Sequence, residues 1–220
     1  MQFFDGTKGA LADGPHPQWM VPAARRVPSP NFDARPDGAP LDVVVIHNIS
    51  LPPGEFGGGY IEALFANTLD CDAHPYFDQL RGLRVSSHFL IRRDGSVRQF
   101  VSTLARAWHA GVSEFQGRQR CNDFSIGIEL EGTDSEAYCD AQYATLVALS
   151  DALLRAHPIA NVCGHQHISP DRKTDPGPSF NWTHFRSALA ALQNQAQFAA
   201  GDRKSTRLNS SHVALSRMPS

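Results

Sequence analysis

The sequence predicts an α/β protein: a single domain in which helices flank a mixed central β-sheet. A short β-branched run at residues 42–47 is typical of a buried strand. Strand-like and helix-like segments then alternate along the chain, which favours helices packed on a sheet. The 220 residues are 41% hydrophobic and 19% charged, a composition typical of a globular chain with one sizeable core.

The first elements follow a leader. Residues 1–22 are rich in glycine and proline and have no sustained period, so we expect a loose segment before a domain that spans 23–200. The run DVVVIH at 42–47 predicts a strand, and the stretch LPPGEFGGG after it excludes regular structure. Residues 60–66 are expected to form a short helix.

The middle of the chain contains a hairpin signal and an alternating strand. Asp94-Gly95 separates two strand-like runs, 84–91 and 96–101, and this dipeptide is common in hairpin turns. Residues 125–131, SIGIELE, alternate between apolar and polar or small side chains. They predict a strand with isoleucines and leucine on one face and serine, glycine and glutamates on the other.

The last elements are two helices with a strand between them. Leucines at helical spacing predict a helix over 138–156, and the apolar run 159–163 is consistent with a strand. A second apolar stripe predicts a helix after Ser179. The tail, 201–220, is expected to be disordered, and its segment 202–212 resembles a translated sequencing-adapter oligonucleotide, so it is excluded from functional reasoning.

Charge and hydropathy exclude several classes of partner. The formal net charge is −2, which does not favour nucleic acid or an anionic membrane. No apolar run approaches the roughly 20 residues that span a bilayer. The N-terminal residues do not resemble a secretory signal, so a cytoplasmic location is expected. The four cysteines are scattered without a CxxC pair and are expected to be free thiols.

Three residues have the chemistry of a catalytic zinc site. His47 ends the first predicted strand, His165 follows the apolar run at 159–163, and Asp175 lies beyond it in the rigid stretch KTDPGP. Two imidazoles and a carboxylate can hold a zinc ion and leave a fourth position for water. The spacing of nine residues between His165 and Asp175 is not a tight motif. The chain also has ten histidines, so any single one of them is a weak signal.

A resemblance makes this interpretation specific. The stretches VVIHNISLPPGEFGG, LRVSSHFLIRRDG, RAWHAGVS, GRQRCNDFSIGIELEGTD and GHQHISPDRKTDPGPSF occur in that order within residues 23–190. They resemble the zinc-dependent N-acetylmuramoyl-L-alanine amidases of type 2, and among these the enzymes that act on 1,6-anhydro-muramyl peptides. The resemblance implies a fold shared with peptidoglycan-recognition proteins, with zinc in a groove at the strand ends.

Catalytic roles follow from the same resemblance. It implies that His47, His165 and Asp175 hold one Zn²⁺ per chain, that Glu129 is the acid and base, and that Lys173 stabilises the oxyanion. Amide hydrolysis needs both a proton acceptor and a proton donor, and a fixed cation beside the carbonyl favours the transition state. Glu131 lies on the same strand face as Glu129, and the period alone does not choose between them. Its alternative role is that of a loop anchor.

Substrate contacts are also implied by the resemblance. Arg84 and Arg120 match positions that bind carboxylates of the stem peptide, for which the planar guanidinium is suited. Their alternative is a pair of surface arginines in ion pairs. Two further candidates come from the residues themselves. Asn48 directly follows the first ligand and is a candidate donor to the peptide backbone, and Trp108 offers a flat face to a sugar ring.

Three further histidines have weaker assignments. His109 either lines the cleft or belongs to the core. His88, within a predicted strand, is expected to be structural. His167 departs from the family pattern and is expected at the surface.

The implied reaction is hydrolysis of the amide between the lactyl group of 1,6-anhydro-N-acetylmuramic acid and L-alanine. In the cell this implies cell-wall recycling and indirect control of β-lactamase induction. The expected partner is a small muropeptide, with no nucleic acid, membrane or obligate protein partner. Two alternatives are an exported autolysin of the same chemistry and a peptidoglycan-recognition module that does not cut. The filled ligand and catalytic positions argue against the second.

Overall fold

The computed structural model describes residues 24–196, so the predicted leader at 1–22 and the tail at 201–220 lie outside the described residues. The chain divides into two compact units between Asn181 and Trp182. The described part of the second unit is a helix over residues 182–196, as the apolar stripe predicts. Within it the rings of Trp182 and Phe185 pack edge to face, with centroids 6.3 Å apart. The sequence-based domain bounds, 23–200, stay a prediction.

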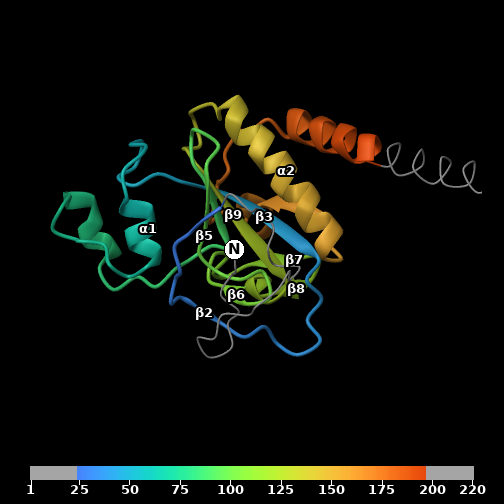
Figure 1. Cartoon of the computed structure of the whole chain (residues 1–220). Coiled ribbons are helices and arrows are strands. Elements are labelled where there is room, and N and C mark those ends of the chain that lie inside the picture. Colours follow the sequence, from blue (N-terminus) through green and yellow to red (C-terminus); the bar gives the residue numbers. More distant parts are fainter. Residues whose placement is uncertain (1–23, 197–220) are drawn as a thin grey trace, which may run out of the picture. The chain divides into compact units, whose positions relative to one another are not determined.

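The first unit is built on a six-stranded sheet (Figure 1). The strands, in spatial order, are β1 (Arg25–Arg26), β5 (Val97–Gln99), β4 (Phe89–Ile91), β9 (Ser125–Glu131), β3 (Val43–Ile49) and β10 (Asn161–Gly164). Within this sheet β4 and β5 pair antiparallel, whereas the other neighbours pair parallel. The predicted mixed central sheet is therefore confirmed.

Short elements complete the unit. Its helical segments are α1 (Tyr60–Phe65), η1 (Pro75–Leu80), η2 (Cys121–Asp123), α2 (Asp140–Ala156) and α3 (His165–Ile168). Two small antiparallel ladders pair β2 (Phe32–Asp33) with β6 (Arg106–Ala107), and β7 (Glu114–Phe115) with β8 (Arg118–Gln119). In the described residues no helix is both apolar enough and long enough to cross a bilayer. The four cysteines are free thiols, as expected.

The predicted hairpin forms, with shorter strands than the sequence suggested. Gly95 has φ of +80°, and a Cβ there would lie 2.8 Å from the carbonyl oxygen of Ala141, so the turn requires glycine. Residues 84–88 were expected to belong to the strand. They do not, because their backbone bonds are divided: the Ser86 N–H donates to Trp108 and the His88 N–H to Gly127.

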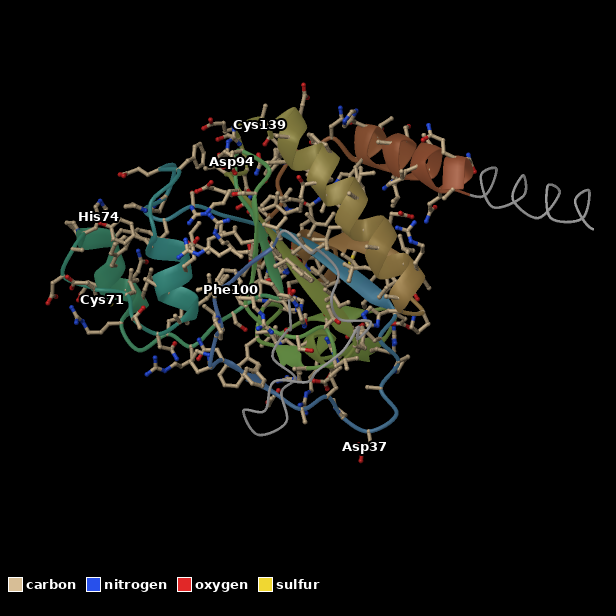
Figure 2. The ribbon with its side chains drawn as sticks, viewed as in Figure 1. Asp37, Cys71, His74, Asp94, Phe100 and Cys139 are labelled. Carbon is tan, nitrogen blue, oxygen red and sulfur yellow. The ribbon has the colours of Figure 1, made fainter. Side chains whose placement is uncertain are left out.

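The sheet is covered on both sides. Figure 1 shows α2 crossing it, with Leu146, Leu149 and Leu153 buried. On the other side α1 and η1 enclose a cluster in which Phe65 meets Phe100 edge to face at 4.9 Å. Figure 2 shows Phe100 between α1 and the sheet. All seven residues of β9 are buried, including the four on its polar face, where His109 and Ser87 lie against Gly127.

A buried charge cluster anchors the glycine-rich loop. Glu131 accepts hydrogen bonds from the Arg92 guanidinium at 2.5 Å, from the Gly57 N–H at 2.7 Å and from the Arg93 N–H at 3.1 Å. Arg92 also bonds Glu62 and the carbonyl oxygen of Gly58. These contacts give Glu131 the role of loop anchor.

Removing the charge of Glu131 is expected to destabilise the fold. In Glu131→Gln the buried Arg92 loses one of its two carboxylate partners and keeps Glu62. Loss of a buried hydrogen bond to a charged group costs about 2 kcal/mol of unfolding free energy. Urea unfolding of the full chain measures this cost. Glu136→Gln is the matched control, because Glu136 is half exposed and lies 3.7 Å from Arg93, so its loss costs less than about 1 kcal/mol. Equal effects of the two substitutions would refute the anchor.

Candidate metal centre

The sheet register brings the predicted site residues together. In the parallel pair β3–β9, His47 lies directly opposite Glu129. On the other side of β3, Gly164 lies opposite Ile46, so His165 leaves β10 next to His47. The carboxyl ends of parallel strands meet at one edge, which is where α/β proteins commonly bind ligands.

His47, His165 and Asp175 form a compact triangle. The Nδ1 atoms of the two histidines are 3.0 Å apart. The Asp175 Oδ2 atom is 3.0 Å from the first and 3.1 Å from the second. Ligand atoms around a tetrahedral zinc are separated by roughly 3.3 Å, given metal–ligand bonds of about 2.0–2.1 Å. The three residues thus constitute a candidate metal site, as the sequence predicted.

Both histidines are suited to binding a cation through a ring nitrogen. The Nε2–H of His165 donates to the Ala110 carbonyl oxygen at 3.1 Å, which leaves Nδ1 with a free lone pair. Burial lowers the pKa of His47 to about 4, so its imidazole is neutral at pH 7, the form that binds metals. The lone pair of His165, the neutral imidazole of His47 and a carboxylate oxygen therefore converge, and a cation among them would balance the charge of the carboxylate.

Backbone contacts hold Asp175 in place. The Gln166 N–H donates to the Asp175 carbonyl oxygen at 2.9 Å and so joins this residue to the first turn of α3. The Tyr138 hydroxyl donates to the next carbonyl, that of Pro176, at 2.7 Å. A Cβ at Gly177 would lie 2.3 Å from Cα of Asp134, so only glycine permits this close approach.

Glu129 lies beside the triangle as a buried carboxyl group with one unused oxygen. Its side chain is 7% exposed, and its Oε2 has no hydrogen-bond partner among the described residues. Burial raises the pKa of Glu129 well above its ordinary value, the negative charge of Asp175 adds to this, and the positive charge of Lys173 opposes it. A buried carboxyl group with a raised pKa and a free oxygen is a candidate for general acid–base chemistry.

The raised pKa makes stability depend on pH in the metal-free protein. Below pH 4.5, the ordinary pKa of the side chain, Glu129 is neutral in both states and costs nothing. Above it, the unfolded chain releases a proton that the folded chain retains, so stability falls until the folded pKa is reached. We expect metal-free Glu129→Gln to be more stable than the wild type, by a margin that grows by roughly 1 kcal/mol per pH unit.

Urea unfolding of both proteins with chelator, between pH 4 and 8, tests this. A margin that stays constant with pH would contradict the raised pKa. Glu55→Gln, at an exposed position in the loop after β3, is the control and should leave the pH dependence of stability unchanged.

A cleft of about 590 Å³ opens over these residues. Its lining includes the predicted side chains of Lys173, Trp108 and Asn48. Lys173 is exposed on the wall, and the Trp108 indole N–H has no partner among the described residues. Asn48 donates from its amide to Asp134 at 2.8 Å. The cleft therefore combines the metal ligands, a carboxyl group, a cation and an aromatic surface.

The two predicted arginines lie outside this cleft. Arg84 is exposed and lines a separate pocket of about 330 Å³ between α1 and η1. Arg120 is 70% exposed, pairs with Asp123 at 3.3 Å and lines another pocket, of about 490 Å³. Arg172 lines both that pocket and the cleft. Binding of the substrate carboxylates by Arg84 and Arg120 stays a prediction.

The three histidines with weaker assignments differ in their contacts. His88 is buried, accepts from the Gly127 N–H at 3.0 Å and bonds the Ala105 carbonyl oxygen at 3.1 Å, which makes it structural. His167 is exposed and accepts from the Gly164 N–H, as a surface residue of α3. His109 lines the cleft, and its Nδ1 lies 2.9 Å from Nε2 of His47. Sequence reasoning left this last contact open.

Comparisons with known proteins agree with the geometry. The profile of the N-acetylmuramoyl-L-alanine amidase family matches residues 37–178. The 1,6-anhydro-N-acetylmuramyl-L-alanine amidase AmpD of Escherichia coli is 61% identical over 170 residues, 76% of this chain and 92% of that protein.

Solved structures of amidases also resemble this chain. The crystal structure of a selenomethionine AmpD derivative superposes with a TM-score of 0.75 at 61% identity, covering 77% of this chain and 96% of that chain. A second structure is that of the E. coli amidase AmiD in complex with the substrate anhydro-N-acetylmuramic acid-L-Ala-D-γ-Glu-L-Lys. It superposes with a TM-score of 0.51 at 29% identity, covering 70% of this chain and 60% of that chain. The chain belongs to the N-acetylmuramoyl-L-alanine amidase family.

Proposed function

We propose that this chain hydrolyses the amide bond between the lactyl group of 1,6-anhydro-N-acetylmuramic acid and L-alanine, in the recycling of muropeptides. The observation that carries the proposal is the convergence of His47, His165 and Asp175 beside Glu129, whose Oε2 has no partner in residues 24–196. The identity of about 60% to AmpD enzymes supports the anhydro-muramyl substrate.

The metal in this proposal is zinc. Two imidazoles and one carboxylate match the ligand sets of catalytic zinc, and His47, His165 and Asp175 would hold it. When bound, zinc supplies a Lewis acid that polarises a carbonyl and makes water more acidic.

Glu129 is assigned proton transfer. Its Oε2 faces no competing donor among the described residues, so the carboxylate is free to accept a proton from the attacking water. The same group then donates this proton to the nitrogen of L-alanine as the amide bond breaks. The raised pKa favours the second step, because a carboxyl group with a high pKa keeps its proton until the leaving amine takes it.

Lys173 and the cleft walls are assigned binding roles. The Lys173 ammonium group is expected to stabilise negative charge on the lactyl carbonyl oxygen, where charge grows only in the transition state. The ring of Trp108 supplies an apolar face for the anhydro-sugar. Asn48, Arg84 and Arg120 are assigned contacts with the stem peptide.

The test is mass spectrometry of anhydro-muramyl tripeptide incubated with the full chain, with zinc and with chelator. Release of free tripeptide only with zinc is the expected result. Intact substrate in both samples, from folded and zinc-loaded protein, would reject the proposed reaction. Unchanged release with chelator, from protein shown to be free of metal, would reject the metal instead.

A cytoplasmic location belongs to the proposal as well. Cell fractionation tests it: the amidase activity should accompany cytoplasmic markers and not periplasmic ones.

A further inference from the structure

We propose that His109 and Ser125 are positioning residues, which fix the tautomer and the orientation of His47 so that its Nδ1 is presented to the metal. This inference rests on the metal-dependent function proposed above. It concerns residues of the chain itself, and each link is a hydrogen bond whose direction is determined by the previous one.

The first link is at the start of β9. The Ser125 hydroxyl lies 2.5 Å from the carbonyl oxygen of Cys121. A carbonyl oxygen only accepts, so the single hydroxyl proton of Ser125 points to Cys121. The Ser125 oxygen therefore has only lone pairs to offer to any other neighbour.

The second link determines the tautomer of His109. Its Nε2 lies 3.2 Å from the Ser125 oxygen. Because Ser125 has no proton left to donate in this direction, Nε2 of His109 carries the hydrogen and donates. A neutral imidazole has one N–H, so Nδ1 of His109 is an acceptor.

The third link determines the tautomer of His47. The acceptor Nδ1 of His109 is 2.9 Å from Nε2 of His47, so this Nε2 carries the hydrogen of His47. The other nitrogen, Nδ1, is left with a lone pair directed at the triangle formed with His165 and Asp175. Cys121, Ser125 and His109 thus specify which nitrogen of His47 binds the metal.

The fold makes space for this chain of bonds. A Cβ at Gly127 would lie 2.6 Å from Cγ of His109, so a side chain on that residue of β9 would displace the ring. The backbone of His109 is also held, because its N–H and that of Ala110 donate to Asn122 Oδ1 at 3.1 and 2.8 Å. The ring meets His47 edge on, with an angle of 85° between the planes.

The same geometry argues against His109 as a ligand. Its Nδ1 contacts Nε2 of His47, whereas His165 and Asp175 contact the opposite nitrogen, Nδ1. The metal-ligand grouping accordingly contains His47, His165 and Asp175 without His109. His109 acts through His47.

Substitution of His109 tests the proposal in the full-length chain. In His109→Leu the acceptor is lost, and we expect zinc affinity, measured by competition with a chromogenic chelator, to fall about 10- to 100-fold, as for other partners behind metal ligands. His109→Asn places an amide oxygen where Nδ1 stood and should recover most of the affinity. Ser125→Ala, which frees His109 to adopt either tautomer, should lower the affinity less.

A second measurement separates positioning from packing. Nitrogen-15 NMR of the metal-free protein at pH 7 reports which imidazole nitrogen carries the hydrogen. We expect His47 protonated on Nε2 in the wild type and in His109→Asn, and a mixture of tautomers in His109→Leu. His157→Asn is the control, because this half-buried histidine bonds the Thr103 hydroxyl at 3.1 Å, away from the site. Its loss should change neither the zinc affinity nor the tautomer of His47.

Two results would overturn the proposal: wild-type zinc affinity in folded His109→Leu, or a hydrogen on Nδ1 of His47 in the metal-free wild type. If His109→Leu does not fold, Ser125→Ala and His109→Asn carry the same tests. A wild-type chain that binds no zinc would reject the proposed function, and the tautomer measurement would still decide the positioning role.

Discussion

Substitution of Asp175 by asparagine is expected to remove both metal binding and amidase activity. The carboxylate is the single negative charge in the triangle, and its Oδ2 lies within 3.1 Å of the two histidine Nδ1 atoms. Partners behind metal ligands already contribute about 10- to 100-fold to affinity, so loss of a ligand should cost more than about 100-fold. Titration with zinc and the tripeptide-release assay measure the two effects.

The matched control for this substitution is Asp171→Asn. Asp171 lies on the same segment, is exposed and has φ of +64°, a conformation that asparagine tolerates. Asp171→Asn removes one negative charge, as Asp175→Asn does, and should leave zinc affinity and turnover unchanged. Wild-type zinc affinity in Asp175→Asn would show that the metal is held elsewhere.

Glu129→Gln is expected to retain the metal and lose turnover. Glutamine has nearly the same shape, so the cleft and the ligand triangle should persist, but its amide neither accepts the proton of water nor returns it to an amine. General acid–base groups contribute roughly 10²- to 10⁴-fold, and the full range applies because one residue serves both steps. We expect kcat to fall by this factor at saturating substrate.

The zinc content of Glu129→Gln is measured in parallel and must equal that of the wild type. The fall in kcat can then be attributed to the loss of proton transfer and not to the loss of metal. Glu114→Gln, an exposed glutamate on β7, provides the control for loss of a carboxylate. A decrease of kcat below about tenfold in zinc-loaded Glu129→Gln would assign the proton transfer to another group.

The strand β9 illustrates how far the sequence predicts the fold and the site. Its alternation predicted the strand and its two faces, and the structure adds what each polar position contacts. Ser125 bonds His109, Gly127 leaves space for the same ring, Glu129 lines the cleft and Glu131 anchors a loop. Periodicity identifies a face, but it does not reveal the partner that approaches that face from a distant segment.

Residues outside regular strands were less predictable. His109 lies on an irregular segment whose path depends on the bonds from Asn122, so its contact with His47 has no local pattern. Gly127, a glycine inside a strand, is a signal of close approach by another group and was available in the sequence. The positions of Arg84 and Arg120 depend on loops, and the resemblance that suggested them concerns residue types rather than geometry.

The origin of the cleft walls has an evolutionary consequence. The ligands and Glu129 come from β3, β9, α3 and the segment around Asp175. The connection at residues 50–88 contributes a separate part of the lining, which includes Pro53, Leu64, Phe65, Tyr76 and Leu83. Insertions, deletions and substitutions in this connection can reshape the cavity while sheet register preserves the distances between ligand atoms. This part of the cleft wall is thereby encoded apart from the metal ligands, and selection can alter its shape without moving them.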